Sequence, residues 1–448
     1  MRTTAPNSEK LEGSSEKGNQ DSSLSLPISH YTPHPPALAP KLRFPEFRDA
    51  EGWTLEAGDA LFDQINDRNP EPGLHVLAIT QEHGAIPRHM IDYHVSVTEK
   101  SIESYKVVRV GDFIISLRSF QGGIEYSRYH GICSPAYVIL RRRGKGSDEY
   151  FRHYLKTDRF IRILTKNLEG LRDGKMISYK QFSELQLPTP TPDEQKKIAE
   201  CLSSLDELLA AQARKVDALK TNKKGLMQQL FPREGETQPR LRFPEFQNAG
   251  EWEETSLGDY FNPIRNGFVG TATPYYTTSD GVRYLQGRNI KQGRIDADNL
   301  IYITIEFHNR QRKSHLKAGD ILLVQSGHVG ECAVVGPDFA GTNCHALVIL
   351  TPKRKLNSEF FVHYFYSAIG EHAIFHITTG NTIKHILASE LKTLPVLVPK
   401  FAEQQRIATC LNNLDALITA ETQKLAALKS HKKGLMQQLF PSAEAYET

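Results

Sequence analysis

One ten-residue sequence decides the organisation of this chain, because it occurs twice without change: KKGLMQQLFP stands at residues 223–232 and again at 432–441. The segments before it also match, with EQKKIAECLSSLDELL starting at Glu194 and EQQRIATCLNNLDALI starting at Glu403. Both matches have the same offset of 209 residues, so no insertion or deletion separates them. A sequence that recurs at one offset indicates a repeated structural unit.

The repeat extends towards the N-terminus in a weaker form. LRFPEF begins at Leu42 and at Leu241, and each copy is followed at the same distance by one of the two tryptophans of the chain, Trp53 and Trp252. Further matches are GDFIIS from Gly111 with GDILLV from Gly319, and FRHYL from Phe151 with FVHYF from Phe361. The offset grows from 199 residues at LRFPEF to 208 at the GD pair, so this region has diverged in length. Each half therefore combines a divergent domain with a nearly fixed segment.

The fixed segments predict two long helices. Pro192 and the carboxylates at 193 and 194 suit a first helical turn, where proline loses no hydrogen bond and negative charge favours the helix dipole. Apolar residues then fill positions a and d of a heptad: Ile198, Leu202, Leu205, Leu209 and Leu219 in the first copy, and Ile407, Leu411, Leu414, Leu425 and Leu428 in the second. Polar residues interrupt both copies at matching layers, which are Gln212 with Glu421 and Lys223 with Lys432. A narrow apolar seam of this kind predicts a coiled coil.

The two helices are expected to pair in antiparallel orientation, because each must carry the chain across to the next domain. Layers would then meet where two residue numbers add to 630, which gives the pairs Leu202–Leu428, Leu205–Leu425 and Leu219–Leu411. In this register Gln212 faces Ile418, and Glu421 faces Leu209. The alternative is two separate amphipathic helices, each packed on its own domain.

The divergent domains are predicted to mix α and β structure. Residues 112–117 and 136–141 form short, β-branched runs typical of strands, whereas 150–164 and 358–375 predict helices. We therefore expect an α+β fold in which two mixed, mainly β domains are joined by two long helices. These helices form an antiparallel coiled coil with pseudo-twofold symmetry. The expected segments are a disordered tail (1–40), a first variable domain (41–189), a first spacer helix (190–235), a second variable domain (240–397) and a second spacer helix (398–448).

The composition allows two or three domains in 448 residues. The 55 Lys and Arg residues nearly balance the 52 Asp and Glu residues, so a nucleic-acid footprint must come from local patches. Five cysteines are too few for a disulfide framework, and no apolar run is long enough to span a membrane. A soluble protein of a reducing cytoplasm is expected. Residues 1–26 are polar and residues 27–40 contain five prolines, which predicts a flexible tail.

The order of these motifs resembles the specificity subunit of type I restriction-modification systems. The resemblance runs from Lys41 almost to the end, and the two KKGLMQQLFP ends are its most specific part. It implies that the variable domains are target-recognition domains, each reading half of a split double-stranded DNA site. The helices would set the gap and dock the partners. The tail exceeds what the resemblance requires, which leaves open where the first recognition domain starts.

The resemblance also implies partners that supply the chemistry. Two modification subunits would bind S-adenosylmethionine and methylate adenine, and restriction subunits would use ATP and Mg to translocate and cleave DNA. This chain is expected to be non-catalytic and to bind no cofactor or metal. It lacks the NPPY or DPPY tetrapeptide of adenine methyltransferases and a GxxxxGK[ST] phosphate loop. Asp193, Glu194 and Lys196 lie in the first turn of a predicted helix, which favours capping over a nuclease site. Cys344 beside His345 favours strand packing over metal binding.

Four loops are candidate DNA readers, because Arg, Lys, Asn and Gln reach base edges while other basic residues neutralise phosphates. The loop after residues 112–117 contributes Arg118, Gln121, Tyr126 and Arg128 around a flexible tip at Gly122 and Gly123, and its counterpart contributes Gln325 and His328. A second pair, aligned at Gly174 and Gly380, contributes Arg172 and Lys175 in one copy and Asn381, Thr382 and Lys384 in the other. Arg142, between Arg141 and Arg143, is a candidate phosphate contact. The alternatives are ordinary polar loops and a solvated charge run.

Two other function classes stay open at this point. A stand-alone DNA-binding regulator could use the same loops, but it would not require a near-identical helical end on both halves. A self-sufficient modification and cleavage enzyme would require the catalytic motifs that the sequence lacks.

Overall fold

The computed structural model describes residues 38–91, 104–166, 177–380 and 384–441. The chain forms two compact units. The first comprises the described parts of 1–146, 154–195 and 438–448, and the second comprises those of 147–153 and 196–437. Each unit therefore contains segments from both halves of the repeat. The predicted tail lies almost entirely outside the described residues.

A four-stranded antiparallel sheet forms the body of each variable domain. Its order is β2-β9-β6-β7 in the first domain and β12-β21-β18-β19 in the second. The strands are β2 (Phe62–Ile65), β9 (Val138–Arg142), β6 (Phe113–Ile115), β7 (Glu125–Tyr126), β12 (Phe261–Asn266), β21 (Leu347–Pro352), β18 (Ile321–Val324) and β19 (Cys332–Val334). The predicted strands at 112–117 and 136–141 are β6 and β9, and the shared strand order confirms the internal repeat.

Shorter pairings surround these sheets. In each domain, a strand near the start of the domain's sequence pairs with a strand near its end. These pairs are β1 (Thr54–Ala57) with β10 (Gln186–Thr189), and β11 (Glu253–Ser256) with β22 (Pro395–Val398). The first domain adds β3 (Leu77–Thr80) with β4 (Gly84–Pro87), and β5 (Lys106–Val108) with β8 (Gly131–Cys133). The second adds the sheet β13-β17-β14-β20, built from Tyr276–Thr277, Ile301–Ile303, Val282–Leu285 and Asn343–Cys344, and the pair β15 (Ile290–Lys291) with β16 (Arg294–Ile295). These additions differ between the domains and include the region in which the two copies diverge in length.

Each helix predicted beside the sheets is divided into two. The pairs are α4 (Asp148–Tyr154) with α5 (Asp158–Lys166), and α10 (Ser358–Phe365) with α11 (Ala368–His376). A hydroxyl side chain starts the second helix of each pair, because Thr157 Oγ1 accepts the Phe160 amide at 3.1 Å and Ser367 Oγ accepts the Gly370 amide at 3.3 Å. Such local caps favour a new helix start over a continuous helix. Besides the two spacer helices, the described residues also form α1 (Gly58–Leu61), α3 (Ser119–Gly122), α6 (Tyr179–Ser183), α8 (Leu257–Tyr260), α9 (Ile305–Arg310) and α12 (Ala388–Thr393).

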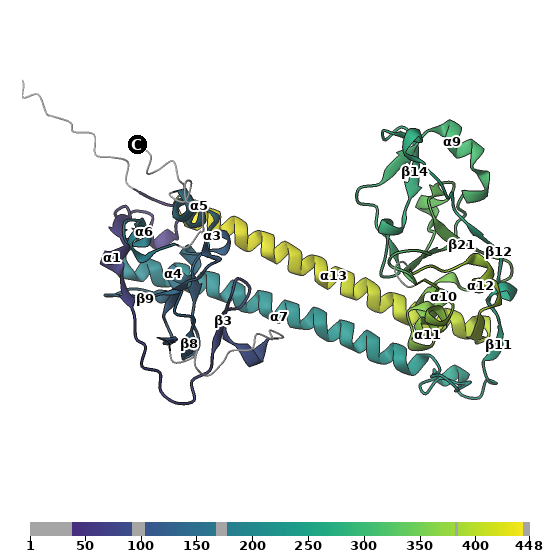
Figure 1. Cartoon of the computed structure of the whole chain (residues 1–448), viewed down its shortest axis with the longest axis horizontal. Helices are drawn as coiled ribbons and strands as arrows, with labels where there is room; N and C mark the ends of the chain where they lie inside the picture. Colours follow the sequence, from purple (N-terminus) through teal and green to yellow (C-terminus); the bar gives the residue numbers. More distant parts are fainter. Residues whose placement is uncertain (1–37, 92–103, 167–176, 381–383, 442–448) are drawn as a thin grey trace, which may run out of the picture. The chain divides into compact units, whose positions relative to one another are not determined.

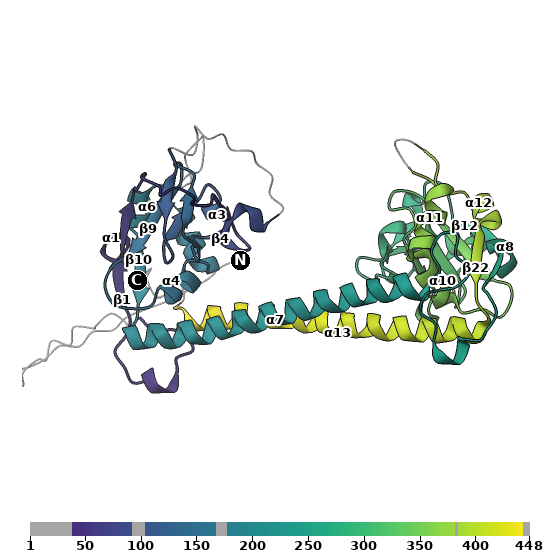
Figure 2. The same ribbon diagram turned by 90° about the horizontal axis from the view of Figure 1, so that it is seen from below.

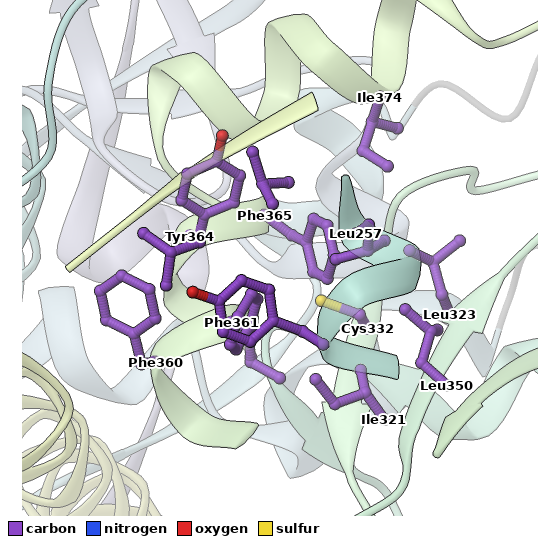
Figure 3. Packing of buried hydrophobic residues seen from close by; sticks show 14 of the residues in the cluster. Leu257, Ile321, Leu323, Cys332, Leu350, Phe360, Phe361, Tyr364, Phe365 and Ile374 are labelled. Carbon is purple, nitrogen blue, oxygen red and sulfur yellow. The ribbon is translucent and has the colours of Figure 1, made fainter. Parts of the chain in front are cut away.

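Aromatic side chains of α10 form the centre of the second domain. Phe360, Phe361 and Phe365 are at most 2% exposed, and they pack against the apolar face of β18 and β21. Figure 3 shows these side chains in one cluster with Ile321 and Leu323 of the sheet. The same core includes residues near the end of the first spacer helix and the start of the second. Burial of this apolar surface therefore attaches the domain to the helices.

The spacer helices are α7 (Pro192–Leu230) and α13 (Phe401–Leu439), and they lie side by side (Figures 1 and 2). The heptad residues are buried or half-buried, with Leu202 and Leu411 fully inaccessible. Lys223 Nζ binds the Asp415 carboxylate at 2.6 and 2.7 Å, and Lys432 binds Asp206. An early residue of each helix thus meets a late residue of the other, which confirms the antiparallel pairing. Both lysines occupy heptad positions of the apolar seam, and their ammonium groups reach carboxylates beside it.

The expected register is wrong by about one heptad. The residue numbers of both Lys–Asp pairs add to 638, whereas the expected layers add to 630. The expected contacts of the central polar residues are wrong as well. Gln212 Nε2 donates to the Glu421 carboxylate at 2.6 Å and to its backbone oxygen at 3.0 Å, so the two interruptions satisfy each other. An a/d pattern repeats every seven residues, so apolar spacing alone does not distinguish registers one heptad apart.

The LRFPEF segments are fastened to the helices by buried ion pairs. Arg43 binds Glu194 at 2.7 and 2.8 Å, and Arg242 binds Glu403 at the same distances. Each guanidinium also donates to two carbonyl oxygens of its own segment. The backbone repeats as well, since Leu42 N donates to Gln438 O and Leu241 N donates to Gln229 O, both at 2.9 Å. Glu194 and Glu403 are thus structural residues of the repeat.

Arg242→Ala should lower the free energy of unfolding by about 3–5 kcal/mol, because it leaves the Glu403 carboxylate buried and uncompensated. Urea denaturation followed by tryptophan fluorescence in a Trp53→Phe background measures this loss. Trp252 is then the sole tryptophan, and its Nε1 lies 3.4 Å from Glu403 Oε1. Arg406→Ala is the control, because its pair with Glu245 is half-exposed and its loss should change stability by less than about 1 kcal/mol. Equal losses for both variants would contradict a special role for the buried pair.

Candidate nucleic-acid interface

The first candidate loop follows β6 and contains the short helix α3. Arg118 and Gln121 are exposed, and they lie at the start of α3 and within it. Ser119 is buried and its hydroxyl accepts the Ser116 amide at 2.9 Å, which closes the base of the loop. The tip that the sequence predicts to be flexible is closely packed at Gly123, which has φ of 78°, and a Cβ there would lie 2.1 Å from the Leu155 oxygen. Close packing at this position therefore requires a glycine. The side chains of Arg118 and Gln121 lie on the short helical turn before it.

Tyr126 and Arg128 differ in how accessible they are. Tyr126 lies on β7 with its ring 5.1 Å from that of Phe113, and it is only partly exposed. Arg128 follows two residues later and is exposed. The geometry thus favours Arg128 over Tyr126 for contact with a large ligand.

The basic run 141–143 is built into the first domain. Arg141 binds the buried Asp112 carboxylate at 2.7 and 2.9 Å, and Arg143 binds Asp63 at 2.7 Å. Arg142 ends β9 and is partly exposed. Two of the three guanidinium groups therefore stabilise the sheet, and the run is no simple solvated charge cluster.

The second domain brings two of the predicted loops together. Ile386 N donates to Gln325 O at 3.0 Å, and Ser326 forms a β-bridge with His385. His385 also exchanges two backbone hydrogen bonds with Thr379, at 2.8 and 2.9 Å. Gln325 is partly exposed, whereas His328 and Lys384 are exposed. Arg172, Lys175, Asn381 and Thr382 lie outside the described residues.

A cavity of about 280 Å³ lies beside these two loops. Val329 and Gly330 of the first loop line it together with Lys384 of the second, and α11 contributes Glu371 and Phe375. Phe375 is 64% exposed, and Lys384 Nζ lies 5.4 Å from the centre of its ring. A carboxylate acceptor, an ammonium donor and an apolar ring in one hollow suit contacts with base edges and phosphate. Sequence reasoning missed Glu371 and Phe375, because helical spacing alone does not tell which face of α11 turns to the loops.

In the described part of the chain, no group of three or more His, Cys, Asp or Glu residues could hold a metal ion. Cys344 lies on β20 and is fully buried among apolar residues, and this burial raises the pKa of its thiol to about 12. The thiol is therefore neutral, as strand packing requires. In the same described regions, no helix is long and apolar enough to cross a membrane.

Comparison with known proteins decides the family. The family model described as the type I restriction modification DNA specificity domain matches twice, at residues 72–221 and 249–430. This chain belongs to that family. It is the DNA specificity subunit of a type I restriction-modification system, and a non-catalytic component.

One curated relative and two solved structures match this specificity subunit over most of their own length. A putative type I restriction enzyme MjaX specificity subunit from Methanocaldococcus jannaschii is 25% identical over 369 residues, which is 78% of this chain and 82% of the relative. The fold is similar to the crystal structure of the S subunit from M. genitalium, with a TM-score of 0.53, 16% identity and coverage of 90% of this chain and 100% of that one. A chain from a structure of type I R-M complex assembly and conformational transition gives a TM-score of 0.52 at 17% identity, covering 87% and 98%.

Mutations in the specificity subunit should distinguish residues that read bases from residues that contact phosphate. Arg118→Ala or Gln121→Ala should relax one position of the target by about 1–3 kcal/mol, because an exposed reading side chain is lost. Arg142→Ala should weaken binding about equally on all sequences and lower the salt slope by roughly 1. Affinities for single-base variants of the target, measured at several salt concentrations, test both. Equal losses on target and non-target DNA for all three variants would remove Arg118 and Gln121 from the reading set.

Proposed function

We propose that this subunit reads a bipartite double-stranded DNA target, with one half-site for each variable domain. The observation that carries the proposal is the repeated sheet order combined with loops that differ between the copies. The first domain offers Arg118, Gln121 and Arg128, whereas the second offers Gln325, His328 and Lys384. A common framework with unlike polar side chains suits two readers of different sequences. We include Arg172, Lys175, Asn381 and Thr382 as candidates on sequence grounds alone.

We propose that catalysis is supplied by partners: two modification subunits that bind S-adenosylmethionine and methylate adenine, and restriction subunits that use ATP and Mg. The chain itself is proposed to bind none of these cofactors. Its five free cysteines support a location in the reducing cytoplasm. The relatives named above support the general assignment, since they are described as subunits of type I enzymes.

Reconstitution tests this function directly. The purified chain alone should neither methylate nor cleave DNA, and adding the cognate modification subunit with S-adenosylmethionine should give adenine methylation at a two-part sequence. Methylome sequencing of a strain expressing both subunits reads out the sequence, and omission of this chain is the control. Methyl transfer by the highly purified chain alone, or methylation that is independent of it, would contradict the proposal.

The repeated helical ends support docking of two identical partners. Burial explains why Met227, Leu230 and Phe231 recur in the second copy, because they pack in the core. It does not explain Lys224 and Gln228, which are exposed and yet recur as Lys433 and Gln437. We propose that each identical exposed pair contacts one modification subunit.

The double variant Lys224→Glu, Gln228→Ala should therefore lose one of two bound modification subunits, because it changes one site and leaves its copy intact. Native mass spectrometry of the reconstituted complex measures the stoichiometry. Arg214→Gln is the matched control, since position 214 is exposed and already differs from its counterpart, Gln423. Retention of both subunits at unchanged affinity would place the docking surface elsewhere.

A further inference from the structure

The loop after β6 in the first domain and the loop after β18 in the second each return to the sheet. Where each loop ends, it contacts a residue that follows a helix of the repeat. This residue is Lys156 after α4 in the first domain and Tyr366 after α10 in the second. The two positions correspond, because FRHYL and FVHYF precede them at the same spacing. Their chemistry differs, but both side chains turn to the end of the loop that follows β6 or β18.

Lys156 holds the end of the loop that carries Arg118 and Gln121. Its Nζ donates to the Gly122 oxygen at 3.1 Å and forms an ion pair with the Glu125 carboxylate. The Glu125 side chain is 3% exposed, and burial raises the pKa of its carboxyl. A charge-assisted bond at a nearly dry site is stronger than a surface pair. One ammonium group therefore connects α3 to the strand that follows it.

Tyr366 performs the corresponding task at the loop that carries Gln325 and His328. Its hydroxyl donates to Glu331 Oε2 at 2.7 Å and accepts the backbone amides of Gly293 at 2.9 Å and Cys332 at 3.1 Å. Burial raises the pKa of this phenol, so it stays protonated and keeps its donor. Glu331 also accepts the Gln292 amide at 2.6 Å. One phenol thus ties the end of the loop to β19 and to the β15–β16 turn.

The reading side chains themselves have little to hold them. Arg118, Gln121 and His328 are exposed, so their directions depend on the backbone of the loop. At its start each loop continues a buried strand, β6 or β18. At its end each loop depends on Lys156 or Tyr366 and on the main-chain hydrogen bonds near them. Base discrimination requires side chains placed within hydrogen-bond tolerance, so a looser end would blur it.

We propose that Lys156 and Tyr366 are positioning residues for DNA recognition, each of which sets the discrimination of one half-site through the loop it fastens. This inference rests on the proposed function, in which these loops read bases. It adds two residues whose effect on specificity would be indirect and confined to one domain. The sequence does not suggest the pairing, because Lys and Tyr share no chemistry beyond a donor at the end of a side chain.

The experiment uses the full-length chain assembled with its modification subunit. Affinities are measured for the cognate target and for targets with single-base changes in either half. Lys156→Met should lower discrimination about tenfold in the half-site that Arg118→Ala affects, and Tyr366→Phe should lower it about fivefold in the half-site that His328→Ala affects. The other half-site and the salt slope should not change. Lys156→Arg should restore most of the discrimination, because it keeps the charge and the donors.

Arg162→Met is the control for the loss of a positive charge, since Arg162 is exposed on α5 and should leave discrimination unchanged. If the loop variants shift discrimination and the Lys156 and Tyr366 variants do not, the inference is wrong and the proposed function stands. If neither set shifts it, the loops are not the readers and the proposed function of these loops fails. Loss of discrimination in both half-sites together would also overturn the inference, because it would indicate a general structural effect. Tyr366→Phe keeps the ring in place, so the second arm decides the question if Lys156→Met does not fold.

Discussion

Two lysines in an apolar seam set the alignment on which the helical pair depends. Leucine layers stabilise α7 against α13, but they would do so almost equally after a shift of one heptad. Lys223 with Asp415 and Lys432 with Asp206 remove that ambiguity, because each ammonium reaches its carboxylate in one alignment. The same alignment lets Gln212 bond to Glu421 and leaves neither group unsatisfied. The pairs are partly exposed, so their contribution is to choose the register more than to add stability.

The sequence was informative where a pattern repeats and uninformative where a contact is unique. The heptads predicted both long helices and their pairing, and the matches of GDFIIS with GDILLV and of FRHYL with FVHYF located equivalent strands and helices. The register was missed because it depends on two polar pairs, and periodicity says nothing of them. The close packing of the first loop was missed because it depends on Leu155 approaching Gly123, a contact between residues far apart in sequence. Likewise, nothing in the sequence placed Phe375 beside Lys384.

Several residues that resemble catalytic groups have structural tasks. Glu403 in a first helical turn binds Arg242, and the buried His363 Nε2 lies 2.7 Å from Asn412 Oδ1. Burial lowers the pKa of His363 to about 4, so the imidazole is neutral and fastens α10 to the spacer helix. The first copy has the same arrangement with a weaker contact, His153 to Ser203 at 3.2 Å. Buried polar groups in this subunit thus connect elements of the repeat, which agrees with a protein that recognises DNA and leaves the chemistry to others.

The two LRFPEF segments approach the helix ends in the same way, although only one of them is covalently continuous with the helix it contacts. Leu241 follows α7 along the chain, whereas Leu42 meets the end of α13 through space, and the hydrogen bonds are the same. The order of elements along the chain is therefore nearly circular: one junction between an LRFPEF segment and a helix end is covalent, and the equivalent one is formed by a hydrogen bond. A ring has no privileged first domain. These equivalent contacts therefore do not dictate which of the two variable domains comes first in the chain.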